Sequence, residues 1–180
     1  FDNNGYVSYS SLIDSIEYAV SRGAKILNMS LGVSQPYDPL YQAIQSAQDK
    51  GCLIVATAGN NDNDIDSNAL YPASYSMESG ITIAASNQKG QRVIRNIPPN
   101  WGSNYGKQRV DLYAPGIEIY STLSSSDNAY GLMSGTSMAA PLVAGIASSF
   151  WARNPDFSAS EVKARILSTV DVPEEPFDGD

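Results

Sequence analysis

Histidine is absent from this 180-residue chain, and that absence limits the chemistry the chain can perform alone. Imidazole is the usual general base at neutral pH, because its unperturbed pKa lies near the physiological range. A chain without histidine cannot by itself run a reaction that depends on such a base. If the protein is an enzyme that needs such a base, another segment must supply it.

Cysteine and long apolar runs are also scarce. Cys52 is the single cysteine, so no disulfide can form within the chain. It stands beside the apolar run Leu53-Ile54-Val55, where a lone cysteine is expected to be a small buried hydrophobe. No run approaches the ~20 apolar residues of a membrane helix, so we expect no membrane partner.

Positive charge is in short supply. Lysine and arginine total 11 against 19 aspartates and glutamates, which gives a net charge of −8. Nucleic-acid binding needs a basic surface, so we expect no nucleic-acid partner. An acidic surface suits a secreted or extracytoplasmic protein. The chain starts at Phe1 without a methionine, so we expect an N-terminal region to precede it in the full-length protein.

Helical and strand-like periods alternate along the chain, as they do in α/β proteins. The helical periods cover residues 11–22, 39–50, 142–151 and 158–170, and the strand-like runs cover 24–30, 52–58, 80–85, 110–113 and 117–123. The run at 52–58 is apolar almost throughout, which is typical of a parallel strand covered on both faces. We predict one domain over residues 1–180, a mostly parallel twisted sheet with helices on both faces. The small apolar residues at 142–151 are typical of a buried helix, and Ser158 with Glu161 predicts a capping box.

One candidate for chemistry is Ser137, which lies in the string Ser134-Gly135-Thr136-Ser137-Met138-Ala139-Ala140-Pro141 before an apolar helix. A serine at a helix N-terminus lies beside unpaired N–H groups and the positive end of the helix dipole. Both features stabilise an oxyanion. The alternative is that Thr136 or Ser137 simply caps the helix.

Two strand ends offer further candidates. Asn60 follows the run at 52–58, and its amide could donate to a developing oxyanion, although a plain turn also explains an asparagine there. Ser30-Leu31-Gly32 follows the run at 24–30 and can offer backbone groups to an extended peptide that adds as a strand. The carboxyl ends of parallel strands meet at one edge of a sheet, which favours a common site.

Taken together, these segments resemble the subtilisin-like serine proteases, or subtilases. The string Gly135–Pro141 resembles the nucleophile signature of that family, which implies that Ser137 is the catalytic serine. The segment Val55–Asn60 resembles the strand that ends in the oxyanion-hole asparagine, which implies that role for Asn60. Two further landmarks match in the family's order, Tyr71-Pro72-Ala73 and Ala114-Pro115-Gly116.

The resemblance implies a substrate groove in which a polypeptide lies between two rails. One rail is Ser30-Leu31-Gly32, and the other is Gly5-Tyr6-Val7. Thr57-Ala58-Gly59 would form one wall of the primary specificity pocket. Leu70, near the pocket floor, would shorten that pocket.

The chain departs from the family pattern mainly in what it lacks. The family's catalytic aspartate and histidine precede the serine, and the resemblance implies that both would lie upstream of this chain. We therefore expect the C-terminal part of a subtilisin-like catalytic domain, incomplete at its N-terminal side. Its expected partner is the N-terminal part of the same domain, and alone it is predicted inactive. Leu142 stands where the family usually has a histidine that is not the catalytic base, so this change affects packing more than chemistry.

The implied activity is that of a serine endopeptidase, in which Ser137 forms an acyl-enzyme and no cofactor is required. The alternative is a pseudoenzyme that keeps the groove only to bind peptides. Subtilases often bind structural calcium through loop oxygens. The loop Asn61–Asp66 carries oxygen ligands at alternating positions, although a solvated acidic loop explains the same pattern. The carbonyls near Ala73 and Tyr75 match a family cation site only weakly.

Overall fold

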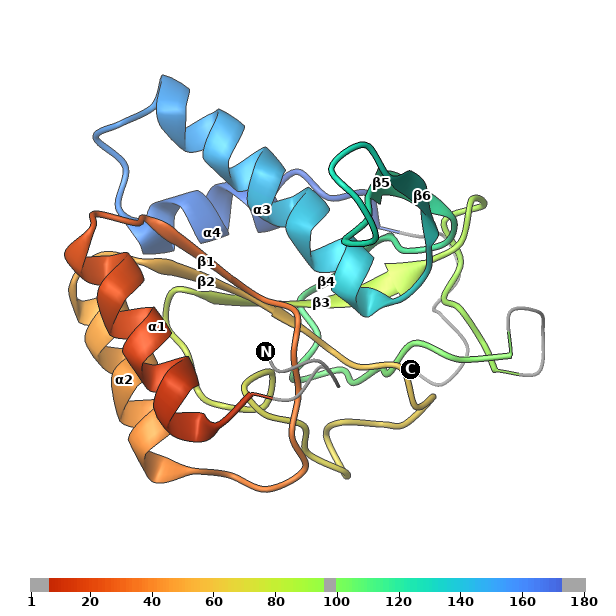
Figure 1. Cartoon of the computed structure of the whole chain (residues 1–180), viewed down its shortest axis with the longest axis horizontal. Helices are drawn as coiled ribbons and strands as arrows, with labels where there is room; N and C mark the ends of the chain where they lie inside the picture. Colours follow the sequence, from red (N-terminus) through yellow and green to blue (C-terminus); the bar gives the residue numbers. More distant parts are fainter. Residues whose placement is uncertain (1–6, 96–99, 173–180) are drawn as a thin grey trace.

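The computed structural model describes residues 7–95 and 100–172 in three layers, a central sheet with helices on both faces (Figure 1). This arrangement confirms the α/β fold that the alternating periods predict. Gly5 and Tyr6, two members of the expected substrate groove, lie outside the described residues. Val7 is described and immediately precedes Ser8, which caps the first helix.

The central sheet consists of four parallel strands in chain order. They are β1 (Ile26–Met29), β2 (Leu53–Thr57), β3 (Gly80–Ser86) and β4 (Leu112–Pro115). The register pairs Met29 with Ala56, so β1 and β2 end side by side. Among the described strands, β1 pairs with β2 alone, and its other edge is open.

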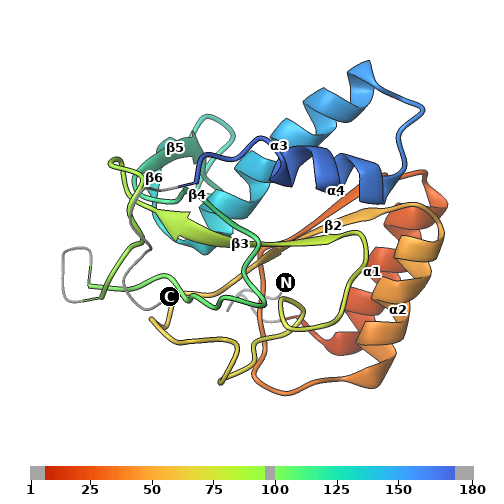
Figure 2. The same cartoon turned by 180° about the vertical axis from the view of Figure 1, so that it is seen from behind.

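Helices α1 (Tyr9–Ser21) and α2 (Asp38–Asp49) cover one face of the sheet, and α3 (Thr136–Arg153) and α4 (Ala159–Leu167) cover the other (Figures 1 and 2). Strand β2 belongs to both cores, because Leu53 and Val55 pack toward α3 and α4 while Ile54 packs toward α1 and α2. All residues of β2 are buried, as its apolar run predicts.

Two local predictions are confirmed. Cys52 is buried, its Sγ donates to the carbonyl of Ala24 at 3.1 Å, and burial raises the pKa of the Cys52 thiol. A thiol in this state behaves as a small hydrophobe. The capping box is also present at the start of α4, where Ser158 and Glu161 bond reciprocally.

Helix α3 differs from the prediction at its start and in its burial. It begins at Thr136 instead of Leu142, with Pro141 inside it. Val143, Ala147 and Trp151 are buried, whereas Leu142 is 38% exposed and Ile146 is 61% exposed, so the predicted burial holds for one face of the helix and not for the other. One apolar face of the helix packs on the sheet and the other is open.

Two strand predictions also need correction. Ala114 and Pro115 form the end of β4 instead of a break, which is possible because β4 is an edge strand and proline is tolerated there. The run at 117–123 is one arm of an antiparallel hairpin, β5 (Ile119–Thr122) with β6 (Tyr130–Met133). Strand β6 was missed, because it is only four residues long and contains Gly131. None of the helices in the described ranges is long and apolar enough to cross a membrane.

Candidate active site

The side chain of Asn60 is held by the first residue of α3. Asn60 Oδ1 accepts hydrogen bonds from the backbone N–H and from the hydroxyl of Thr136, each at 2.9 Å. Since the oxygen of the amide is taken, its two Nδ2 donors face away from Thr136. Asn60 is exposed and Thr136 is fully buried, so a buried residue orients a donor that a ligand can reach.

Ser137 is the second residue of α3 and is half-buried. The helix N-cap is Gly135, which makes no side-chain cap hydrogen bond. The alternative that Thr136 or Ser137 caps the helix is therefore wrong. Among the described residues, none bonds to the Ser137 hydroxyl or to its backbone N–H. The hydroxyl and the N–H of Ser137 thus remain available to a ligand.

The start of α3 provides a favourable field for an anion at Ser137. The helix has 18 residues and no acidic residue in its first turn. The unpaired N–H groups there form the positive end of the helix dipole. An oxyanion near Ser137 would also meet the Nδ2 donors of Asn60. The arrangement can therefore stabilise negative charge that develops on a substrate oxygen.

A proline in α3 explains how the end of β1 joins the site. Pro141 has no N–H, so the carbonyl of Ser137 loses its partner four residues along the helix. The hydroxyl of Ser30 donates to that carbonyl at 3.0 Å instead. The contact ties the expected substrate rail to the residue expected to be the nucleophile. Leu31 is half-buried against α1 and α2, and Gly32 is exposed.

The expected pocket wall, Thr57-Ala58-Gly59, is buried and supports the site from beneath. The Thr57 hydroxyl donates to the Thr136 hydroxyl, and the Gly59 N–H donates to the same oxygen at 3.2 Å. Gly59 has a φ of +100°, a value that favours glycine. Sequence reasoning gave Thr136 only a capping role, because its partners lie 76 to 79 residues away.

Leu70 lies between the ends of β1 and β2. A Cβ on Gly32 would be 2.8 Å from Leu70 Cδ2, and a Cβ on Gly59 would be 2.6 Å from the same atom. The isobutyl group therefore occupies the gap between the two strand ends. The structure thus places Leu70 against both strand ends, and its role at the floor of a specificity pocket stays a prediction.

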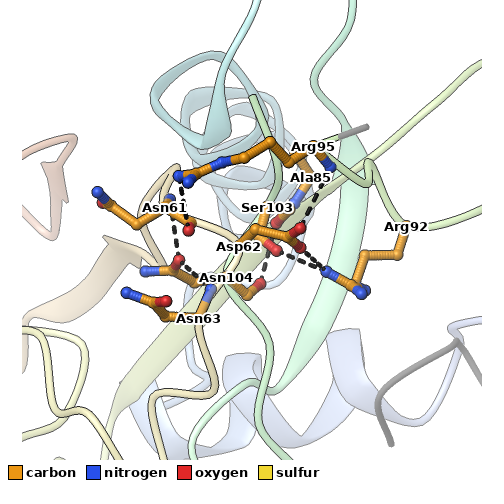
Figure 3. Close-up of polar contacts among 8 residues, drawn as sticks. All are labelled: Asn61, Asp62, Asn63, Ala85, Arg92, Arg95, Ser103 and Asn104. Carbon is orange, nitrogen blue, oxygen red and sulfur yellow. Dashed lines mark hydrogen bonds and ion pairs between the residues drawn. The ribbon is translucent and has the colours of Figure 1, made fainter. Parts of the chain in front are cut away.

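Asn104 is a residue of this site that sequence reasoning missed (Figure 3). Its Oδ1 accepts the N–H groups of Asn61 and Asn63, both at 3.0 Å, and its Nδ2 donates to the carbonyl of Ala58 at 2.8 Å. Asn104 is 2% exposed. No signal in the sequence links it to residues that lie more than 40 positions earlier.

Most of the expected cation ligands in the acidic loop already have partners within the protein. Asp62 forms an ion pair with Arg92, Asp64 accepts from the N–H of Asp66, and Asp66 Oδ2 accepts from the N–H of Gln108. Asp66 Oδ1 is buried and has no hydrogen-bond partner among the described residues. Residues 7–95 and 100–172 contain no group of three or more histidine, cysteine or acidic side chains that could hold a metal. Calcium binding by this loop stays a prediction.

Ala73 and Tyr75, whose carbonyls are the other expected cation ligands, line a polar pocket. Lys163 and Asp111 line the same pocket, with Lys163 Nζ 3.8 Å from Asp111 Oδ1. The carboxylate also accepts the N–H of Thr82 at 2.7 Å. An ammonium group beside the single carboxylate reduces the fit of this pocket to a divalent cation.

An exposed amide and a serine whose hydroxyl and N–H have no partner among the described residues thus lie at the start of α3, an arrangement that can stabilise an oxyanion. The model of the subtilase family matches residues 1–178. The chain therefore belongs to the subtilase family.

Individual relatives agree with this assignment. The chain is 36% identical over 170 residues to subtilisin DY of Bacillus licheniformis, covering 94% of this chain and 58% of that protein. It is 38% identical to thermitase of Thermoactinomyces vulgaris, covering 94% and 55%. The crystal structure of a cold-adapted subtilisin-like serine proteinase matches with a TM-score of 0.78 at 31% identity, covering 91% and 55%. The chain thus spans somewhat more than half the length of these relatives.

Proposed function

We propose that the full-length protein containing this chain is a serine endopeptidase that cleaves peptide bonds through an acyl-enzyme on Ser137. The observation that carries the proposal is the pairing of Asn60 Oδ1 with Thr136 at 2.9 Å, beside the unpaired N–H of Ser137. The start of α3 thus has two independent donors, Asn60 Nδ2 and the Ser137 N–H. Two such donors are what a tetrahedral oxyanion requires.

In the proposed mechanism, Ser137 Oγ attacks the scissile carbonyl carbon and its proton passes to a histidine. The negative charge that forms on the carbonyl oxygen is stabilised by Asn60 Nδ2 and the Ser137 N–H. The histidine then protonates the leaving amine, and water hydrolyses the ester on Ser137. Since this chain contains no histidine, the base and the aspartate that orients it come from a preceding segment of the same protein.

We further propose that this preceding segment completes the catalytic domain, of which residues 1–180 form the C-terminal part. The open edge of β1 offers unpaired backbone groups to another strand. Exposed apolar side chains lie on α3 and β6: Leu132, Met133, Leu142 and Ile146. A partner that covers them would remove apolar area from water. The chain alone is proposed to be inactive.

The proposed substrate is a polypeptide that lies along Ser30-Leu31-Gly32 as an added strand. Its primary side chain enters the gap between the ends of β1 and β2. Leu70 occupies the far end of that gap, so the pocket is proposed to take small side chains.

The proposed chemistry requires no cofactor, and structural calcium is a separate proposal. Chelation by EDTA tests it. If the ammonium of Lys163, and not a calcium ion, balances the charge of Asp111, EDTA should leave the melting temperature of the protein unchanged. A fall in melting temperature on chelation, reversed by added calcium, would support a calcium site instead. The acidic composition, with a net charge of −8, supports the proposal of a secreted or extracytoplasmic location.

Casein hydrolysis by the full-length protein tests the proposed function. Wild type should release peptides, and Ser137→Ala should lose that activity by several orders of magnitude. Ser148→Ala, an exposed position on the same helix, is the matched control and should retain activity. Equal activity of Ser137→Ala and wild type would contradict the proposal. Peptide binding by wild type without hydrolysis would favour the pseudoenzyme.

A further inference from the structure

Asn104 bonds to the backbone on both sides of Asn60, and Figure 3 shows its contacts with Asn61 and Asn63 on the C-terminal side. On the N-terminal side, its Nδ2 donates to Ala58 O at 2.8 Å and its backbone N–H donates to Gly59 O at 2.9 Å. On the C-terminal side, its Oδ1 accepts the N–H groups of Asn61 and Asn63. Asn60 is therefore the one residue from 58 to 61 that Asn104 does not bond, and it is the residue proposed to donate to the oxyanion.

The segment that carries Asn104 is itself anchored to the sheet. The hydroxyl of Ser103, which is fully buried, accepts the N–H of Ala85 in β3 at 2.8 Å. Arg92 donates to the carbonyl of Ser103 at 3.1 Å and forms an ion pair with Asp62, whose other oxygen accepts the N–H of Arg95. Through these contacts, Asn104 fixes the loop that carries Asn60 relative to β3.

That loop needs such support, because the chain leaves the regular sheet before it reaches Asn60. Strand β2 ends at Thr57, and the backbone then passes through positive φ at Gly59 (+100°) and at Asp62 (+58°). An oxyanion donor acts only when it is held close to its working position before the reaction begins. A displacement of about 1 Å can cost about 100-fold in rate.

We infer that Asn104 is a positioning residue for the oxyanion donor Asn60. The inference rests on the proposed function, since it assigns Asn104 a role in the rate of the reaction through Asn60. Asn104 itself touches neither the substrate nor Ser137 in this role. Its effect is on the geometry of one transition-state contact, so it should influence kcat and leave KM unchanged.

Steady-state kinetics of Asn104→Ala in the full-length protein provides the first readout. The expected result is a fall in kcat of about 10-fold to 100-fold with KM within about twofold of wild type. End-point titration of Ser137 with a fluorophosphonate counts the active molecules, so a folding defect does not enter kcat. Asn104→Asp keeps the acceptor for Asn61 and Asn63 but not the donor to Ala58, so its kcat should be intermediate.

Gln48→Ala is the matched control. Gln48 Oε1 also accepts a backbone N–H, that of Ser79 at 2.9 Å, and this contact lies at the amino end of β3, whereas Asn60 follows the carboxyl end of β2. Loss of the same type of contact there should leave kcat unchanged. A fall in kcat for Gln48→Ala as large as that for Asn104→Ala would overturn the inference, because any weakened backbone contact would then have the same effect.

A double-mutant cycle separates positioning from general support of the fold. In an Asn60→Ala background the oxyanion donor is gone, so Asn104→Ala should lower kcat no further. An equal fold-loss in both backgrounds would overturn the inference. If the alanine variant does not fold, the same cycle with Asn104→Asp decides. Wild type without hydrolysis would overturn the proposed function and this inference with it, whereas active wild type with an unchanged Asn104→Ala variant would overturn the inference alone.

Discussion

Thr136 connects the end of β2 to the start of α3 through its hydroxyl and its backbone N–H. Its hydroxyl accepts from Thr57 and from the N–H of Gly59 and donates to Asn60 Oδ1, while its backbone N–H bonds the same Oδ1. All of these groups lie at the junction of β2 and α3. One buried hydroxyl therefore fixes the orientation of the amide that is proposed to bind the oxyanion.

Substitution of Thr136 by valine should lower both activity and stability. Valine keeps the shape but leaves the Gly59 N–H and the Thr57 hydroxyl without their partner, at about 1–3 kcal/mol per unsatisfied group. We expect kcat of the full-length protein to fall about 10-fold, because the backbone N–H of residue 136 still holds Asn60. Thr136→Ser, which restores the hydroxyl, should recover most of kcat. Equal kcat in Thr136→Val and wild type would show that the hydroxyl does not orient Asn60.

Leu70 is predicted to set the preference for the primary substrate side chain. Its Cδ2 atom lies where side chains on Gly32 and Gly59 would collide with it, so the pocket between them is short. In the full-length protein, kcat/KM should be higher for a peptide with alanine before the scissile bond than for one with phenylalanine. Leu70→Ala should shift that ratio toward phenylalanine by about 10-fold or more.

Because the Leu70 prediction concerns a ratio between two substrates, it does not depend on the fraction of active protein. Leu167→Ala, in a partly buried position on α4, is the control and should leave the ratio unchanged. A ratio that is the same in Leu70→Ala and wild type would place the pocket elsewhere.

At the scale of elements, the sequence predicts buried strands and helix starts better than it predicts the course of α3. The apolar run of β2 and the pair Ser158 and Glu161 carry local signals, and both predictions are confirmed. Gly135 and Pro141 are typical helix breakers, so the apolar run predicts a helix only from Leu142, whereas α3 begins at Thr136. Pro141 is accommodated because Ser30, which is distant in sequence, satisfies the carbonyl that the proline leaves free.

The candidate site likewise contains residues that a local motif identifies and residues that only distant contacts identify. Ser137 and Asn60 were found through motifs that are contiguous in sequence. Thr136 and Asn104 act through hydrogen bonds to residues between 41 and 79 positions away, and a single sequence does not reveal such pairings. Their roles follow from the way the fold joins α3 and the loop before β4 to the end of β2.

The capping box of α4 predicts a pH-dependent contribution to stability. The backbone N–H and the hydroxyl of Ser158 bond the Glu161 carboxylate and lower the pKa of Glu161 below its ordinary value of 4.5. Because the pKa is lower in the folded state, the stabilisation is complete above the unfolded value and is lost as the pH falls through the folded value.

Glu161→Ala should therefore lower the melting temperature of the full-length protein at pH 7, and the difference from wild type should shrink as the pH falls below 4.5. Thermal unfolding followed by circular dichroism over this range provides the measurement. Glu17→Ala, an exposed position within α1 and away from its N-terminus, is the control and should show a smaller difference at pH 7. A difference for Glu161→Ala that is constant with pH would refute the role of its carboxylate.

At the scale of the whole molecule, the described part of the chain has an open sheet edge and an open apolar face. Leu132, Met133, Leu142 and Ile146 are between 38% and 61% exposed on β6 and α3. Exposed strand edges and apolar faces favour association with other chains. In the full-length protein these surfaces are proposed to contact the segment that carries the histidine and the aspartate.

The 180-residue chain alone should therefore associate at micromolar concentration, as light scattering would detect. Ile146→Glu should reduce that association, because it places a charge on the open face of α3. Tyr18→Glu, at a position on α1 that is 69% exposed, is the control and should leave it unchanged. A clean monomer for the unmodified chain would count against an interface at this face.

Labelling by a fluorophosphonate probe, followed by peptide mass mapping, most directly tests whether Ser137 is a nucleophile whose base lies outside this chain. We predict rapid modification of Ser137 in the full-length protein and none in the purified 180-residue chain, because the chain has no histidine. An unlabelled Ser137 in the full-length protein would contradict the proposed nucleophile. Equal labelling of the isolated chain would contradict the proposal that its base is supplied from elsewhere.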